Sequence, residues 1–206
     1  KVIHLSSVGV VGKPFSSQSI QIKEDCAPTP QNEYERTKNI SEQLFRESAK
    51  TYAFDLVVLR PTNVFGENHP FNALLNLMKT VESGKPLVLV KGAKVNYVYV
   101  SDVSASIISA LENKTKSGIY NVGYSMGLRE FYTIIMSAMN SKTRIIKVPS
   151  ILTNFASKMG VNKLNSISNR LEYADDQLKQ NFSYPFGIEK GIENTVEHFK
   201  KQGALK

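Results

Sequence analysis

The chain has 206 residues, of which 41% are hydrophobic and 21% charged, as in a soluble globular protein large enough for a real core. Its longest aliphatic run, LVVL at 56–59, is far shorter than the roughly 20 apolar residues of a membrane-spanning helix. The net charge is +8, but the lysines are scattered and not interleaved with aromatic residues, which favours a solvated surface over nucleic-acid binding. We therefore expect no membrane and no nucleic acid as partners, and an anionic small ligand stays compatible.

The compartment and the extent of the chain follow from its first residues and its cysteine. The single cysteine, Cys26, cannot form an internal disulfide, and the first residues lack a signal-peptide pattern, so we expect a cytoplasmic protein. The sequence starts without methionine, directly in the strand-like run at 2–5. We expect it to be a fragment of a longer subunit.

Strand-like and helix-like segments alternate along the chain. Residues 13–33 are polar and rich in proline, so we expect a long loop there. The hydrophobic periodicity predicts strands at 2–5, 54–61, 86–90, 95–100, 118–123 and 144–149, and helices at 33–51, 72–83, 101–114, 128–140, 172–180 and 187–202. This alternation predicts an α/β fold with a mostly parallel sheet.

Tyr34 and Lys38 lie four residues apart at the start of the predicted helix at 33–51. Residues at this spacing share a helix face, and a cation beside a phenol stabilises the phenolate, which could then exchange a proton near neutral pH. A Tyr-x-x-x-Lys match arises about once by chance in a chain of this composition, so the motif is weak alone. Its interpretation depends on the surrounding motifs.

Three further segments give the motif a context. HLSSVGVVG (4–12) ends a strand in two serines and glycines, LRPTNVFG (59–66) leaves the next long strand through Pro61 and Asn63, and NYVYVSDVSASI (96–107) joins a strand to a helix through Asp102. Ser7 and Asn63 thus follow strand ends, where open α/β sheets bind ligands. We expect Asp102 to be structural, as an N-cap of the helix at 101–114.

This order of motifs resembles the extended short-chain dehydrogenase/reductase superfamily, in its NAD-dependent epimerase/dehydratase branch acting on nucleotide sugars. The resemblance implies a Rossmann-like parallel sheet with a smaller α/β substrate-binding domain, NAD as cofactor with NADP left open, and a homodimer formed by the full-length subunit. Residues 1–66, with segments around 95–113, would belong to the NAD-binding domain, and 67–206 mainly to the substrate-binding domain.

The resemblance also implies roles for individual residues. Tyr34 would take a proton from a sugar hydroxyl as hydride passes to the nicotinamide, Lys38 would also hold the nicotinamide ribose, and Ser7 would hydrogen-bond the reacting oxygen. The implied cofactor contacts are Ser6, Tyr34, Lys38, Pro61 and Thr62, and the implied substrate contacts are Ser7, Asn63, Lys94 and Asn96. No metal is expected, since His4, His69 and His198 form no ligand pattern.

Departures from the family pattern narrow the expected reaction. The 4,6-dehydratases carry Thr-Asp-Glu where this chain has Ser7, Val8 and Gly9, and the keto-sugar epimerase–reductases carry a cysteine where Val8 stands. C4 epimerisation or 4-keto reduction therefore remains. Val11 stands where the family has a loop tyrosine, and Val95 stands where it often has an arginine that clamps the substrate phosphate. Lys94, beside Val95, is a weaker substitute for that arginine, and Arg170 is a further candidate for the phosphate contact.

Two features leave alternatives open. The family's Gly-x-x-Gly-x-x-Gly turn is not in the sequence, so we expect the chain alone to bind NAD weakly and to be inactive. An enzyme of the same family acting on a hydroxysteroid or dihydroflavonol is an alternative, and Asn63, Asn68 and Asn96 favour a sugar over it. A non-catalytic NAD-sensing protein is the other, although it would be expected to lose Ser7, Tyr34 or Lys38.

Overall fold

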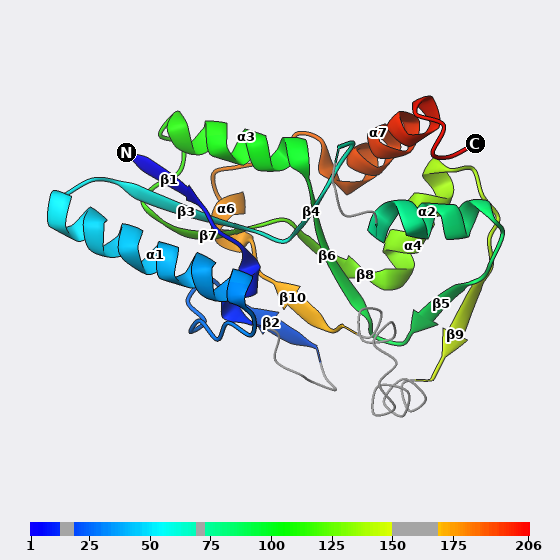
Figure 1. The fold of residues 1–206 in the computed structure, drawn as a ribbon, viewed down its shortest axis with the longest axis horizontal. Helices are drawn as coiled ribbons and strands as arrows, with labels where there is room; N and C mark the ends of the chain where they lie inside the picture. Colours follow the sequence, from blue (N-terminus) through cyan, green and yellow to red (C-terminus); the bar gives the residue numbers. More distant parts are fainter. Residues whose placement is uncertain (13–18, 69–72, 150–168) are drawn as a thin grey trace.

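The computed structural model describes residues 1–12, 19–68, 73–149 and 169–206 (Figure 1). A three-stranded parallel sheet, in the order β1-β3-β7, contains β1 (Val2–Leu5), β3 (Leu56–Pro61) and β7 (Gly118–Val122). Every residue of β3 is buried, as expected for a central strand covered on both faces. The covers are α1 (Glu33–Tyr52) on one side and α3 (Val100–Leu111) on the other (Figure 1).

A second sheet continues from the end of β3. It has the order β4-β6-β8, in which β4 (Asn63–Phe65) is parallel and β8 (Tyr124–Gly127) antiparallel to β6 (Lys94–Tyr99). One residue, Thr62, separates β3 from β4. The chain therefore passes from one sheet to the other at the carboxyl end of β3.

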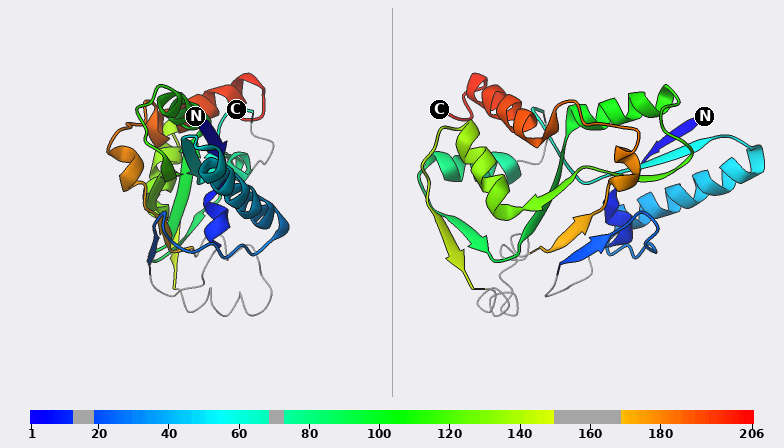
Figure 2. Two further views of the ribbon diagram at one scale, coloured as in Figure 1. Left: turned by 90° about the vertical axis from the view of Figure 1, so that its left-hand side faces the viewer. Right: turned by 180° about the vertical axis from the view of Figure 1, so that it is seen from behind.

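The remaining elements lie at two places. Helices α2 (Ala73–Glu82) and α4 (Leu128–Ala138) and the parallel pair β5 (Leu87–Val90) and β9 (Ile145–Val148) lie at the opposite end of the molecule from α1 (Figure 2). The helix α7 (Gly187–Lys201) packs against α4 and β6. Residues 6–12, here called the Ser7 loop, contain the short 3-10 helix η1 (Val8–Val11). The parallel pair β2 (Ile20–Ile22) and β10 (Leu171–Tyr173) lies beside it, and α6 (Asp176–Lys179) follows β10 in the chain.

Separate hydrophobic clusters hold these parts together. One lies between the first sheet and α3 and contains Val57, Leu59, Val103 and Val122. A larger one joins α2, α4, α7 and β5 through residues such as Met78, Phe131 and Ile192. A third, smaller cluster contains the η1 valines, Ile22, Leu171 and Tyr173.

The α/β class and the longer elements agree with the sequence-based predictions. The exceptions are short: β4 and β8 were not predicted, β2 lies inside the predicted loop at 13–33, and the predicted helix at 172–180 is β10 followed by the four residues of α6. β1, β5 and β9 are as short as β8 but are mainly apolar runs, whereas β2, β4, β8 and β10 mix polar and apolar residues over only three or four positions and give no clear period. β7 pairs with β3, so residues beyond the expected 95–113 segment also join the first sheet.

Asp102 has a structural role, but not the expected one. The N-cap of α3 is Tyr99, and Asp102 lies in the first turn of that helix. Its carboxylate accepts hydrogen bonds from the backbone N–H groups of Phe186 and Gly187, both at 3.0 Å. Asp102 therefore ties down the start of α7, and its burial raises the pKa of its carboxyl.

Among the described residues, none of the helices is both long and apolar enough to cross a membrane. The same part of the chain contains no group of three His, Cys, Asp or Glu side chains placed to hold a metal ion.

Candidate active site

A cavity of about 420 Å³ opens at the junction of the two sheets. It is lined by residues from the Ser7 loop, the first turn of α1, the β3–β4 junction, α2, β6 and α7: Ser7, Tyr34, Thr62, Asn63, Val64, Phe65, Gly66, Ala73, Leu74, Leu75, Tyr97 and Phe199. Four residues predicted from sequence, Ser7, Tyr34, Thr62 and Asn63, therefore meet at one site. The predicted residues Ser6, Lys38, Pro61, Lys94 and Asn96 are not in the described lining.

The Ser7 loop is held rigidly by its own apolar residues. Ser7 is the N-cap of η1, and its Oγ accepts a hydrogen bond from Gly9 N at 3.1 Å. The three valines of η1 are buried and fix the turn. At Gly12, φ is +75° and an added Cβ would lie 2.3 Å from the Thr29 carbonyl oxygen, so the loop closes only with glycine. The Ser7 hydroxyl keeps its own proton to donate into the cavity.

The start of helix α1 is fixed by its capping residues, Asn32 and Glu35. Asn32 is the N-cap and its side chain accepts from Glu35 N at 2.9 Å, while Glu35 Oε2 accepts from Gln31 N at 2.7 Å. This fixes the first turn, which carries Tyr34. The Tyr34 side chain is 58% exposed and borders the cavity.

Lys38 lies one turn further along α1 and points to the end of β1. Its Nζ donates a hydrogen bond to the Leu5 carbonyl oxygen at 3.0 Å. Leu5 is the last residue of β1 and directly precedes Ser6 and Ser7. The ammonium thus lies behind the Ser7 loop, on the face of α1 that also carries Tyr34.

A buried ion pair fastens α1 to the central strand. Arg60 in β3 donates from Nε to Glu42 Oε1 at 2.9 Å and from Nη2 to Glu42 Oε2 at 2.6 Å, and both side chains are only 2% exposed. Its Nη1 donates to the Glu24 carbonyl oxygen at 3.1 Å. Two-point pairing of this kind fixes direction as well as distance. Neither residue was among the sequence-based candidates, although Glu42 follows Lys38 at helical spacing.

Two buried hydroxyls near the cavity lack an internal partner. Among the described residues, nothing bonds to Thr62 Oγ1 or Ser6 Oγ, although both residues are buried. Their backbones are fixed, since Thr62 N donates to Val122 O at 2.9 Å and Ser6 N to Leu59 O at 2.7 Å. Pro61 is the last residue of β3, in register with Val122. Buried polar groups are normally satisfied, so these two hydroxyls are exceptions. Both oxygens are closed off from solvent and Thr62 Oγ1 lies against Gly123, so a nicotinamide would reach them only after the side chains rotate.

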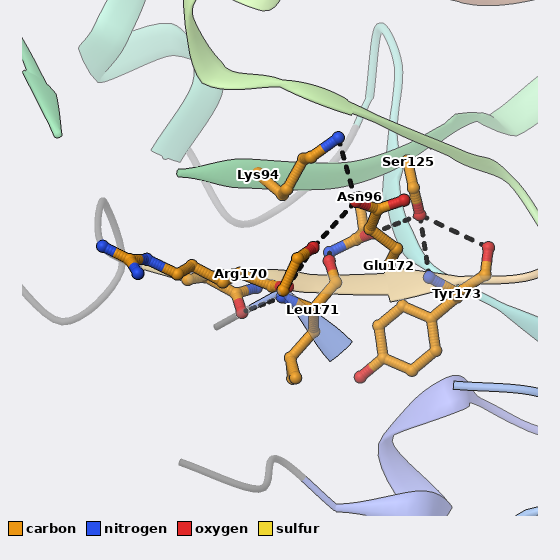
Figure 3. Close-up of polar contacts among 9 residues, drawn as sticks. Lys94, Asn96, Ser125, Arg170, Leu171, Glu172 and Tyr173 are labelled. Atoms are coloured by element: carbon orange, nitrogen blue, oxygen red, sulfur yellow. Dashed lines mark hydrogen bonds and ion pairs between the residues drawn. The ribbon is translucent and has the colours of Figure 1, made fainter. Parts of the chain in front are cut away.

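Asn63 and Asn96 are linked, but only Asn63 borders the cavity. The Asn63 Nδ2 donates to the Asn96 carbonyl oxygen at 2.8 Å. The Asn96 side chain is 2% exposed; its Nδ2 donates to Leu171 O at 3.0 Å and its Oδ1 accepts from the Ser125 hydroxyl (Figure 3). These contacts tie β6 to β8 and β10, which argues for a structural role for Asn96 and against the predicted substrate contact.

Lys94 is also engaged within the protein. Its Nζ pairs with Glu172 Oε1 at 2.9 Å, and Ser19 Oγ donates to the same oxygen at 2.8 Å (Figure 3). These two contacts lower the pKa of the Glu172 carboxyl, so it is ionised at neutral pH. A carboxylate beside Lys94 offsets its charge, which weakens the expected contact with substrate phosphate. The nearby Arg170 donates to Lys91 O at 3.2 Å.

A carboxylate fills the space beside Gly9. A Cβ built on Gly9 would lie 3.1 Å from Glu35 Cγ and 3.4 Å from Glu35 Oε1. A side chain at position 9 would therefore press on the flexible Glu35 side chain, which would have to shift by a few tenths of an ångström.

Sequence reasoning missed much of the cavity wall. Leu74, Leu75, Tyr97 and Phe199 contribute apolar surface from α2, β6 and α7. Each belongs to an ordinary amphipathic pattern, and nothing in that pattern distinguishes a core residue from one that borders a cavity.

Comparisons with known proteins agree with this geometry. The model of the NAD dependent epimerase/dehydratase family matches residues 1–123. The dTDP-D-glucose 4,6-dehydratase of Bos taurus is 22% identical over 219 residues, covering 98% of this chain and 56% of that protein. The dTDP-4-dehydro-6-deoxyglucose reductase of Escherichia coli is 25% identical over 162 residues, covering 75% of this chain and 50% of that protein. The chain thus spans about half the length of these curated relatives.

A solved structure shows the same fold. The crystal structure of UDP-glucuronic acid 4-epimerase from Bacillus cereus, in complex with NAD, aligns with a TM-score of 0.70 at 20% identity. The alignment covers 97% of this chain and 61% of that one. The family match covers more than half of the chain and includes the Ser7 loop, the Tyr34–Lys38 turn and the end of β3. The chain therefore belongs to the NAD dependent epimerase/dehydratase family.

Proposed function

We propose that the full-length protein is an NAD-dependent nucleotide-sugar 4-epimerase or 4-keto reductase, with Ser7, Tyr34 and Lys38 as its catalytic residues. The observation that carries the proposal is the meeting of Ser7 and Tyr34 in one cavity, beside the unpartnered hydroxyl of Thr62. When bound, NAD would supply the hydride acceptor for epimerisation and, in its reduced form, the hydride donor for 4-keto reduction, with NADP as the alternative cofactor.

The residues then act in a simple sequence. The Tyr34 phenolate takes the proton of the sugar hydroxyl that is oxidised, and returns it when the carbonyl is reduced. Ser7 donates its hydroxyl hydrogen to the reacting oxygen, because its Oγ already accepts from Gly9 N. Lys38 stabilises the phenolate electrostatically from the next helical turn. Thr62 and Ser6 offer hydroxyls, and Pro61 its position at the strand end, for holding the nicotinamide end of the cofactor.

The substrate contacts are less complete than the catalytic ones. Asn63 borders the cavity and is the strongest of the proposed substrate contacts. Lys94 stays a proposed phosphate contact only if substrate displaces it from Glu172. Dehydration is not part of the proposal, because Val8 and Gly9 stand where the 4,6-dehydratases carry Asp and Glu.

One observation favours a second candidate. The cavity wall formed by Leu74, Leu75 and Phe199 is apolar, and such a wall suits a hydroxysteroid or dihydroflavonol better than a sugar. The relatives named above act on nucleotide sugars, which keeps the sugar first. A non-catalytic NAD-sensing role has no comparable observation in its favour.

We also propose a homodimer that forms through α1. Ile40, Leu44 and Tyr52 are 47%, 59% and 76% exposed on that helix, and Ile40 and Leu44 share a face. An apolar surface of this kind is typical of a subunit interface. The unpaired Cys26 is consistent with the reducing cytoplasm as the proposed compartment.

The experiment is a substrate screen on the full-length protein. It is incubated with NAD or NADP and with UDP- and dTDP-sugars, a hydroxysteroid and a dihydroflavonol, and products are separated by chromatography. Interconversion of C4 epimers, or reduction of a 4-keto sugar, supports the proposal, provided that Ser7→Ala and Tyr34→Phe abolish it. Turnover of the steroid or flavonoid alone would replace the sugar with the second candidate.

A further inference from the structure

Lys38 has two possible partners on α1 at the same spacing. Tyr34 lies four residues before it and Glu42 four residues after it, so all three share one helix face. A carboxylate attracts an ammonium more strongly than a phenol or a carbonyl oxygen does. The Lys38 ammonium nevertheless donates to the Leu5 carbonyl oxygen, at the strand end next to Ser7.

Arg60 accounts for this choice. It binds both carboxylate oxygens of Glu42, at 2.9 and 2.6 Å, and the pair is sealed from solvent. The third donor of Arg60 is fixed by the Glu24 carbonyl oxygen. The charge of Glu42 is therefore neutralised from the sheet side, and both of its oxygens are occupied by Arg60.

We propose that Arg60 is a positioning residue for the Tyr34–Lys38 pair: by holding both oxygens of Glu42, it keeps the Lys38 ammonium at the end of β1 instead of along α1. The inference deepens the proposed function and rests on it. Without Arg60, the Glu42 carboxylate would be buried without its partner, and the cations at pairing spacing along α1 are Lys38, four residues before it, and Arg46, four residues after it. When Lys38 turns to Glu42, the phenolate of Tyr34 would lose part of its stabilising charge.

The other charged groups around Lys38 do not replace Arg60. On β1, His4 packs against Phe45; its burial and Lys38 lower its pKa, Glu42 raises it, and the net direction is downward, so it is neutral at pH 7. In η1 all four residues are valine or glycine, and in β3 Arg60 is the charged residue. On α1, the Glu35 carboxylate accepts from Gln31 N, and in the segment before α1 the Glu24 carboxylate accepts from Asn121 N.

The test is the pH dependence of turnover in the full-length protein, measured with the nucleotide sugar that the screen identifies. The variants are Arg60→Met, the double variant Glu42→Met/Arg60→Met, and Lys50→Met as a control for loss of an exposed charge on α1 that is not within one turn of Glu42. Thermal unfolding and NAD affinity are followed in parallel.

We expect Arg60→Met to raise by about one unit the pH at which turnover begins to increase, since a neighbouring opposite charge shifts a pKa by about one to three units. The double variant should return the rise to the wild-type pH, because it removes the competing carboxylate along with the arginine, and apolar replacement of a buried pair is often tolerated. Lys50→Met should leave the profile unchanged.

The inference is overturned if Arg60→Met lowers thermal stability without moving the profile, or if the double variant stays shifted. If Arg60→Met does not fold, Arg60→Lys takes its place: one ammonium holds Glu42 less completely, so a smaller upward shift is expected, and an unmoved profile refutes the inference. Failure of the proposed function looks different, because Tyr34→Phe would then retain wild-type turnover, or no sugar would react.

Discussion

Gly123 offers a test of how the cavity is built, because it lies against Thr62 at the end of β7. Its φ is +143°, and an added Cβ would meet Thr62 Oγ1 at 2.2 Å, Cγ2 at 3.1 Å and Cβ at 3.2 Å. The backbone N–H of Gly123 is also held in place, because it donates a hydrogen bond to the Tyr184 hydroxyl at 2.7 Å. Gly123→Ala must therefore strain the backbone or displace Thr62.

The expected cost has two parts. A non-glycine residue in this backbone region costs about 1–3 kcal/mol, and overpacking a close contact costs about 1–3 kcal/mol. We therefore expect Gly123→Ala to lower the free energy of unfolding by about 2–6 kcal/mol. The matched control is Gly203→Ala, where φ is +68° and nothing lies within 4 Å of the added Cβ. That variant carries only the conformational cost, about 1–2 kcal/mol.

The assay is urea unfolding of the full-length protein, combined with a double-mutant cycle to Thr62→Ala. Thr62→Ala removes Oγ1 and Cγ2, so Gly123→Ala should cost about 1–3 kcal/mol less in that background. Strictly additive effects, or a Gly123→Ala cost no greater than that of Gly203→Ala, would refute the claim that Gly123 and Thr62 are packed against each other.

Three further predictions concern Asn96, Glu24 and α1. Asn96→Ala should lower the free energy of unfolding by about 1–3 kcal/mol, since it removes the side-chain donor to the Leu171 carbonyl, while the Ser125 hydroxyl keeps its bonds to Tyr173; a stable variant with a raised KM would favour the substrate contact instead. Burial raises the pKa of Glu24 above 4.5, so folding takes up a proton, and the stability that protonated Glu24 contributes is lost as pH rises through the raised value. Glu24→Gln should accordingly raise the melting temperature at pH 7 and not below pH 4, and an equal gain at both would contradict this. Leu44→Lys should convert a dimer into a monomer by light scattering at micromolar concentration; a monomeric, active wild type would exclude the proposed interface.

The sequence predicts the longer elements well because each carries its own local signal. The helix from Glu33 has an N-cap, a periodic face and acidic residues in its first turn, and β3 is a continuous apolar run ended by proline. The short strand β10 has no such signal, since three residues give no reliable period and its pairing with β2 joins segments far apart in the sequence.

The same distinction holds at the candidate site: residues in local sequence motifs could be predicted, and contacts made by tertiary packing could not. Ser7, Tyr34, Thr62 and Asn63 lie in motifs at strand ends or at a helix start, and the fold brings them to one cavity. Asn96 has the same residue type as Asn63, but its position in the middle of β6 turns it inward to Leu171 and Ser125. The ion pair of Arg60 and Glu42 depends on how α1 crosses β3, which local spacing does not contain.

The central claim is that Tyr34 exchanges the proton in the reaction. The most direct measurement is the turnover of Tyr34→Phe in the full-length protein with NAD and its nucleotide sugar, beside thermal unfolding of the same sample. The variant keeps the ring and removes only the hydroxyl, and the side chain is largely exposed, so the melting temperature should stay unchanged. Turnover should fall by about 10²–10⁴-fold, whereas turnover equal to that of the wild type would contradict the account.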